Sequence, residues 1–277
     1  MKEGDTTDIY VLSEGCIADI LSLTTPRDAC RSSVVSLMFR SAADSDSVWE
    51  RFLPSDIQLI LSSSMFPSLP NFSSKKEQFL HLCDNPLLID NGTKTFALEK
   101  CSGKKCYMIG AKQLAISWGD TPLYWNWPSL PESRFSEVAE LLRVCWLEIR
   151  GRMKTRLLSP NTTYVAYLVF KLTDNAYGFG NAHPVEVSVK LVGGDRAEQG
   201  EVKLVYLNKP EETEADSRPE GVPKERKDGW MEIKMGEFFN ERDEDRMVEM
   251  SLMEVDDYNW KSGLIIQGIE LRPKWNH

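Results

Sequence analysis

The sequence lacks the segments and motifs that identify membrane proteins and the common enzyme classes. No apolar run among its 277 residues is long enough to span a bilayer, and no charged-then-apolar leader follows Met1. A P-loop, a GxSxG motif and an HExxH motif are all absent. We therefore expect an intracellular protein of the cytoplasm, the nucleus or both, without catalytic residues of its own.

Side chains that bind metals are few. Only three histidines occur, none beside a second ligand-type residue at metal spacing, and the six cysteines form no CxxC pair. These counts predict a reducing compartment, no metal site and no cofactor. The net charge of −9 also argues against nonspecific binding to nucleic acid or to anionic membranes.

The first 54 residues, by contrast, are typical of short, capped helices. Ser13 is a good N-cap, and Ile17, Ile20 and Leu21 follow it at the i, i+3, i+4 spacing of one helix face. This pattern predicts an amphipathic first helix with an apolar side.

Three further helices are predicted after it. Thr25 and Pro26 supply the cap and the first position of the second helix, and residues 33–43 predict the third. Trp49 and Phe52 lie in a fourth. A module of about forty residues has only a marginal core, so a partner or the rest of the chain must cover its apolar side.

The pattern changes after a predicted linker with short helices at residues 55–94. From Thr95 onward, apolar and polar residues alternate with the period of β-strands. Strands separated by Gly, Asn and Asp turns, without helices between them, indicate a sandwich or jelly roll, so the predicted fold class is α+β with several domains. The main predicted strands are 164–173, 185–191, 201–207, 230–235, 247–255 and 264–271.

Tryptophan is abundant, with eight residues in all and three of them within residues 118–128. Rings so close together, between Gly, Pro and Asn, cannot all enter one core from a regular strand. At least one is expected to lie flat at the surface, where it can stack on the apolar face of a sugar. The alternative is that Trp118 and Trp127 belong to the core of the sandwich.

Residues 8–54 resemble an F-box, from Leu12-Ser13-Glu14 to the ending Trp49-Glu50-Arg51-Phe52-Leu53. The pair that usually opens the motif, Leu-Pro, is Leu12-Ser13 here. F-boxes dock on Skp-type adaptors of cullin–RING ubiquitin ligases by laying helices into an apolar groove. The resemblance implies adaptor contacts from Leu12, Ile17, Ile20, Leu21, Pro26, Trp49 and Phe52. The alternative is that these helices are the amino-terminal part of one globular protein.

The rest of the chain resembles the plant phloem-protein-2 lectins, which are related to the tobacco agglutinin Nictaba. The resemblance implies a jelly-roll-like β-sandwich over residues 95–277 that binds N-acetylglucosamine oligomers and N-glycan cores without metal. The segments that carry it are 106–108, 111–120, 124–127, 165–172, 228–233 and 260–264.

The same resemblance implies positions for the sugar site. Two binding-site tryptophans of the family fall on Trp118 and Trp125, and a glutamate falls on Glu254. A second family glutamate falls near Met247, where this chain has no carboxylate. Because an unpaired buried hydroxyl weakens binding, this loss bears on the sugar preference.

Together these resemblances imply the substrate-recognition subunit of an SCF-type ubiquitin ligase. The helical module would bind a Skp-type adaptor, and the sandwich would bind a glycoprotein or another target. Two alternatives stay open at this point. One is a carbohydrate-binding stress lectin without a ligase role, and the other is a protein–protein receptor whose sugar site has decayed.

Overall fold

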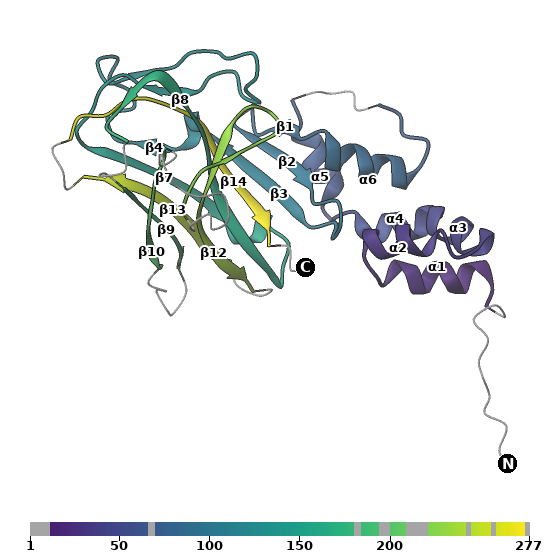
Figure 1. The fold of residues 1–277 in the computed structure, drawn as a ribbon. Coiled ribbons are helices and arrows are strands. Elements are labelled where there is room, and N and C mark those ends of the chain that lie inside the picture. The colour runs from purple at the N-terminus through teal and green to yellow at the C-terminus, as the bar shows by residue number, and fades with distance from the viewer. Residues whose placement is uncertain are drawn as a thin grey trace, which may run out of the picture. The chain divides into compact units, whose positions relative to one another are not determined.

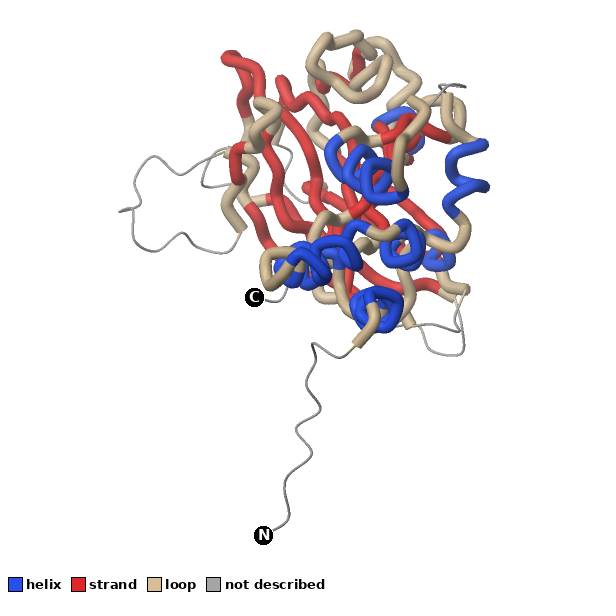
Figure 2. The backbone as a smooth tube through the Cα atoms, turned by 90° about the vertical axis from the view of Figure 1, so that its right-hand side faces the viewer, coloured by secondary structure: helices blue, strands red, loops and turns tan. Residues whose placement is uncertain are grey.

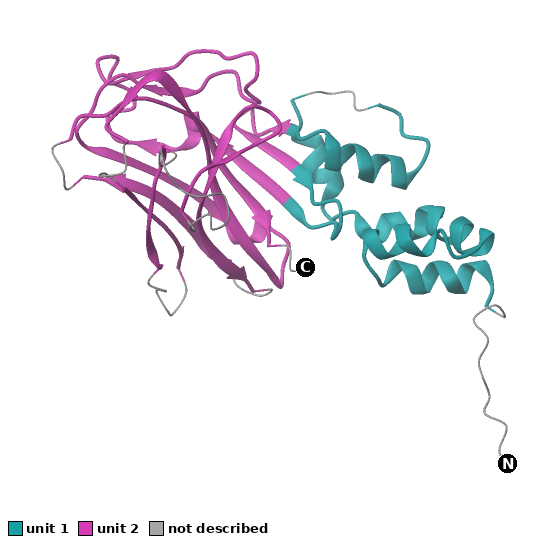
Figure 3. Ribbon diagram, in the orientation of Figure 1, with its two compact units in different colours: residues 1–87, 97–105 teal, residues 88–96, 106–277 magenta. Residues whose placement is uncertain are grey.

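The computed structural model describes residues 12–65, 70–179, 184–193, 200–208, 221–241, 245–255 and 259–274. Residues 8–11, at the start of the predicted F-box, lie outside this part. The chain divides into two compact units (Figure 3). One comprises residues 1–87 and 97–105, and the other comprises residues 88–96 and 106–277.

The first unit is helical (Figure 1). Its helices are α1 (Glu14–Ser22), α2 (Pro26–Ser32), α3 (Leu37–Asp44), α4 (Asp46–Phe52), α5 (Ile57–Ser62) and α6 (Lys75–Asp84). Four of them begin at a side-chain hydroxyl that accepts a backbone N–H from the first turn, at Ser13, Thr25, Ser36 and Ser74. The predicted caps of α1 and α2 are therefore confirmed, and each satisfies an N–H group without an intrahelical acceptor.

Helix α3 begins later than the sequence pattern predicts. Residues 33–35 form a turn after α2, and the helix starts at Leu37 instead of residue 33. The cause is the cap at Ser36, whose Oγ accepts the N–H of Phe39 at 3.3 Å. The apolar run within residues 33–43 predicts one helix, but the first half of the run lies in the turn.

The core of this unit is aromatic. The ring of Trp49 in α4 lies 5.5 Å from that of Phe52 and 5.2 Å from that of Phe79 in α6. Its Nε1 donates a hydrogen bond to the carbonyl oxygen of Ala43 at 2.6 Å. Since Phe79 is fully buried, α6 is part of this unit and not merely of a connecting segment.

The second unit is a β-sandwich (Figures 1 and 2). One sheet has the order β1-β2-β3-β14-β8-β12-β11, with β6 pairing β14 and β5, and the other has the order β10-β9-β13-β7-β4. Its strands are β1 (Leu87–Ile89), β2 (Lys94–Leu98), β3 (Lys105–Gly110), β4 (Ala115–Ile116), β5 (Trp125–Asn126), β6 (Ala139–Leu141), β7 (Leu147–Lys154), β8 (Thr162–Tyr177), β9 (Val185–Val192), β10 (Val202–Val205), β11 (Lys224–Glu225), β12 (Met231–Asn240), β13 (Met247–Glu254) and β14 (Ser262–Pro273).

The two sheets pack closely along β7. Its buried side chains alternate with outward-facing ones, as expected for a strand with one face on the core. A Cβ atom at Gly151 would lie 3.0 Å from Cδ1 of Ile269 on β14, in the other sheet. A larger residue at this position would push the side chains of Ile269 and Leu114 away by a few tenths of an ångström. The predicted fold class, a helical module followed by a β-sandwich, is confirmed, and all six main predicted strands are present.

Candidate functional site

The helical unit buries most of the residues predicted to contact an adaptor. Ile20 is 50% exposed and Leu12 is partly exposed. The other five predicted residues, Ile17, Leu21, Pro26, Trp49 and Phe52, are buried in the core of the unit. The helical period of α1 explains why Ile17 and Leu21 are buried while Ile20 is half exposed. Ile17 and Leu21 share the face that points inward.

A different set of apolar side chains faces solvent. Val34 and Leu37 are 85% and 84% exposed, which is unusual for side chains of this kind in a row. We call the set the α1–α3 surface: Ile20, Leu23, Val34, Val35, Leu37 and Met38. They come from α1, from the turn after α2 and from the start of α3. The apolar run at residues 34–38 was visible in the sequence, but its orientation was not.

An apolar cavity of about 560 Å³ lies in the same unit. Trp49, Phe79 and Val34 are among its lining residues, and the cations that line it are Arg27, Arg31 and Lys100. Val34 thus belongs both to the cavity and to the α1–α3 surface. A volume of this size lies within the ordinary range of binding pockets.

In the sandwich, the two predicted sugar-binding tryptophans differ in exposure. Trp118 is 48% exposed, has a positive φ of 56° and lies 5.7 Å from the ring of Tyr124. Trp125 is buried, and its Nε1 donates to the carbonyl oxygen of Ser117 at 3.1 Å. The exposed ring of Trp118 can therefore contact a ligand. Trp125 instead fixes the backbone at Ser117, the residue immediately before Trp118.

The third predicted residue, Glu254, is also buried. Its carboxylate forms an ion pair with Lys261, whose Nζ donates to the carbonyl oxygens of Cys145 and Asn259 at 2.9 and 2.6 Å. A carboxylate engaged in this way is not open to a sugar hydroxyl. It holds the ends of two strands together instead.

Strand pairing nevertheless brings Trp118 and Glu254 to one end of the five-stranded sheet, while Trp125 lies on β5 of the other sheet. Glu254 pairs with Leu147, and Ile116, two residues before Trp118, pairs with Ile149. Met247 pairs with Lys154 at the other end of β13. It lies seven residue steps along the strand from Glu254, roughly 23 Å at the usual rise per residue. The missing acid at Met247 therefore does not alter this end of the sheet.

The polar centre of this end is Glu148 on β7, one of several carboxylates among which the sequence alone cannot single out a site residue. Its carboxylate accepts hydrogen bonds from Trp146 Nε1 at 3.2 Å, Arg150 Nε at 2.7 Å and Ser117 Oγ at 3.3 Å. The hydrogen bond from Trp146 and the nearby Arg150 hold the pKa of Glu148 below its usual range, although burial opposes this. Trp146 and Glu148 are two residues apart in the sequence, which places both on one face of a strand. Nothing in the sequence places Glu148 beside Ser117.

The buried carboxylates in the described part of the sandwich are paired with cations. The buried ones, Glu249, Glu254 and Glu270, all lie in ion pairs with lysine or arginine. A paired carboxylate is a poor general base, because its charge is already stabilised. Such groups instead fix neighbouring side chains and accept hydrogen bonds.

None of the helices in the described part of the chain is long and apolar enough to cross a membrane. In the same residues, no group of three or more His, Cys, Asp or Glu side chains gathers where it could hold a metal ion.

Comparison with known proteins gives matches over nearly the whole chain. Residues 104–273 match the model of the family described as Phloem protein 2. One F-box protein of Arabidopsis thaliana is 48% identical over 97% of this chain and 81% of its own length. F-box protein PP2-B10 of that plant is 48% identical over 94% and 92%, and F-box protein VBF is 45% identical over 96% and 100%.

Solved structures show a much weaker likeness. The CBM22-1 xylan-binding domain of Paenibacillus barcinonensis Xyn10C covers 61% of this chain and 87% of its own, at 10% identity and a TM-score of 0.29. At that score the likeness carries no functional argument.

Proposed function

Because the chain belongs to the plant F-box proteins that carry a phloem protein 2 domain, we propose that it is the substrate-recognition subunit of an SCF-type ubiquitin ligase. Its helical unit docks on a Skp-type adaptor, and its sandwich binds a glycoprotein through N-acetylglucosamine or an N-glycan core. Ubiquitin transfer then follows from the proximity of target and ligase. Nucleic acid, membrane and metal have no part in this function.

The α1–α3 surface carries the ligase half of the proposal. Burying a side chain such as Leu37 against a partner stabilises the complex by about 1.5–3 kcal/mol relative to leaving it in water. Six such side chains on three consecutive segments match the requirement for laying helices into an apolar groove. Ile20 and Leu12 are the predicted residues that would touch the adaptor directly. The buried five support the surface from within.

The charges around the apolar cavity indicate the chemical character of the segment that binds there. Arg27 and Arg31 are one turn apart on α2, and Lys100 lies at the same cavity. Cations beside an apolar hollow favour a partner segment that combines an apolar side chain with acidic neighbours. We expect the adaptor to supply such a segment, and we expect binding to weaken as ionic strength rises.

The exposed ring of Trp118 carries the lectin half. A ring that is 48% exposed and supported by Tyr124 can stack on the C–H face of a sugar. Trp125 anchors the loop through Ser117, and Glu254 with Lys261 fixes the strand ends below it. In this proposal only Trp118 of the three touches the ligand, and the other two position it.

Binding to a recombinant Skp-type adaptor tests the proposal. Replacing Val34 and Leu37 by Asp places two charges where a groove must bury them, and we expect affinity to fall at least about a hundredfold. The matched control is Leu59→Asp on α5, a residue that is 73% exposed but lies outside the α1–α3 surface. This control should bind as the wild type does.

Adaptor binding that survives the double substitution would contradict the docking surface. A wild-type chain that binds glycan and no adaptor would instead be a carbohydrate-binding lectin without a ligase role.

A further inference from the structure

Exposed tryptophans in the described part of the sandwich gather at one end. Trp118, Trp146 and Trp260 are 48%, 43% and 42% exposed, while the described tryptophans elsewhere are buried or half-buried. A single exposed ring is ordinary on a protein surface, but several gathered on one face mark an interaction site. Three on one end of one sandwich therefore point to a binding surface larger than a single ring.

The segment 143–148 connects these three rings. At one side, Val144 and Lys261 exchange both backbone hydrogen bonds, at 3.0 and 2.7 Å, which places Trp260 beside the segment. At the other side, the carbonyl oxygen of Glu148 accepts the N–H of Ser117 at 3.0 Å. Ser117 directly precedes Trp118. Trp146 lies between these two connections.

The ring of Trp146 is held in place although it is exposed. Its Nε1 donates to Oε2 of Glu148 at 3.2 Å, and the same oxygen accepts Ser117 Oγ at 3.3 Å. Arg150 Nε bonds the other oxygen at 2.7 Å. A side chain fixed before binding loses little conformational entropy when a ligand arrives. Trp146 therefore has the exposure and the rigidity of a stacking residue.

Trp260 differs from the other two, because a cation already covers it. The guanidinium carbon of Arg143 lies 4.5 Å from the centre of its ring. This cation–π contact occupies one face of the indole. Trp118 and Trp146 are thus the two exposed indoles of this end without such a cation in the described residues.

We propose that Trp146 is a second sugar-stacking residue of the site and contacts the second or a later ring of a bound oligosaccharide. The inference rests on the proposed glycan binding and names a further residue that holds that ligand. One sugar stacks on Trp118 and a later one stacks on Trp146. The ionised Glu148 and the Arg150 guanidinium next to Trp146 are placed to bond hydroxyl or acetamide groups of the second sugar.

Titration calorimetry with N-acetylglucosamine and its dimer, trimer and tetramer tests this assignment on the full chain. We expect Trp146→Ala to weaken binding of the trimer and tetramer about tenfold through lost stacking and burial, with little effect on the monosaccharide. Trp118→Ala should weaken every length. The control is Phe239→Ala, an exposed aromatic residue on β12 in the other sheet.

A loss that is equal for all lengths in Trp146→Ala, or no loss at any length, would overturn the second stacking position while leaving the glycan site in place. A wild-type chain that binds none of the four sugars would overturn both. Trp146→Phe keeps a ring and should retain more trimer affinity than Trp146→Ala. Thermal unfolding of each variant verifies that the sandwich remains folded.

Discussion

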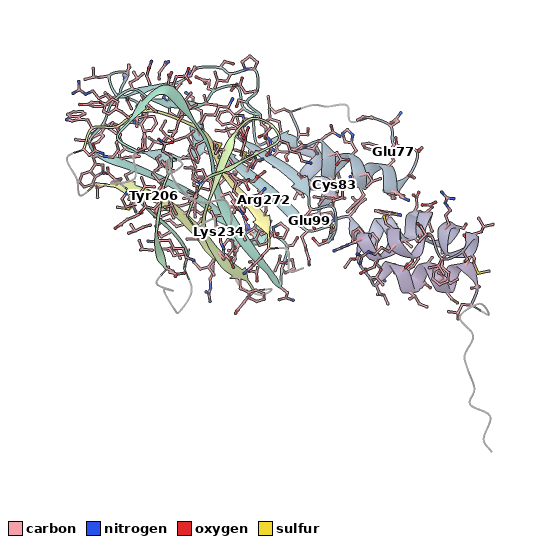
Figure 4. The ribbon with its side chains drawn as sticks, viewed as in Figure 1. Glu77, Cys83, Glu99, Tyr206, Lys234 and Arg272 are labelled. Carbon is pink, nitrogen blue, oxygen red and sulfur yellow. The ribbon has the colours of Figure 1, made fainter. Side chains whose placement is uncertain are left out.

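At the scale of single residues, the outer face of the larger sheet depends on Glu270. Burial alone would raise the pKa of its carboxyl, but Arg226, Arg272 and Arg134 bring that pKa below its ordinary value. Arg226 Nη1 lies 2.6 Å from one oxygen and Arg134 Nη1 lies 3.0 Å from the other. Arg272, labelled in Figure 4, also bonds both oxygens of Glu232.

This network predicts a stability that depends on acid. The folded chain holds the proton of Glu270 less tightly than the unfolded chain does, so its contribution is complete above the ordinary pKa of about 4.3 and is lost as the pH falls below it. Glu270→Gln removes the carboxylate that these arginines share and should cost about 2 kcal/mol at neutral pH, although Asp228 and Glu232 still pair with them.

Urea unfolding of the full chain from pH 7 to pH 3 measures both effects. The free energy of unfolding should fall less steeply toward low pH in Glu270→Gln than in the wild type. Parallel pH profiles for the two proteins would show that Glu270 is not a source of the acid sensitivity.

At the scale of elements, the turn before α3 and the first two residues of α3 present most of the proposed docking surface, and the start of α3 depends on one cap. Ser36→Ala removes the acceptor for the N–H of Phe39 and should cost about 1 kcal/mol of stability in the helical unit. The turn that holds Val34 and Val35 would loosen, so adaptor affinity should fall in the same variant.

Serine 45 offers a matched control for this prediction. It stands at the N-cap of α4 but makes no side-chain capping bond. Ser45→Ala should therefore change the thermal midpoint and the adaptor affinity less than Ser36→Ala does. Equal effects of the two substitutions would contradict the role of the Ser36 cap.

Most elements could be predicted from local sequence, because caps and strand alternation are local signals. The caps at Ser13 and Thr25 and the long strand around residues 164–173 are examples. Which side of each short helix points into the core could not be predicted in this way. Each has only about two turns, so the period alone did not tell Ile17, which is buried, from Ile20, which is half exposed.

Contacts within the candidate site could not be predicted from the sequence either. Trp118 was found from its neighbours in sequence, but the contact between Ser117 and Glu148 joins residues 31 positions apart. Register between strands decides such contacts, and a single sequence does not contain it. The position near Met247 came from the family resemblance, and it stands at the opposite end of β13 from Glu254.

At the scale of the whole molecule, the proposed function requires one chain to bind two partners at once. The α1–α3 surface lies in the helical unit, and the Trp118 and Trp146 rings lie in the sandwich. The two sets share no residue. Substitutions in one unit should therefore leave binding by the other unchanged, since sites without shared residues or shared partners act independently.

The most direct test is retention of a Skp-type adaptor on a resin that carries N-acetylglucosamine oligomers. The account predicts that the adaptor is retained only when the full chain is present, and that free trimer releases both together. Trp118→Ala should lose the resin but keep the adaptor in solution, and the Val34, Leu37 double Asp variant should keep the resin but lose the adaptor. An adaptor that binds the chain in solution but never reaches the resin would contradict the central claim, because target recognition would then not use glycans.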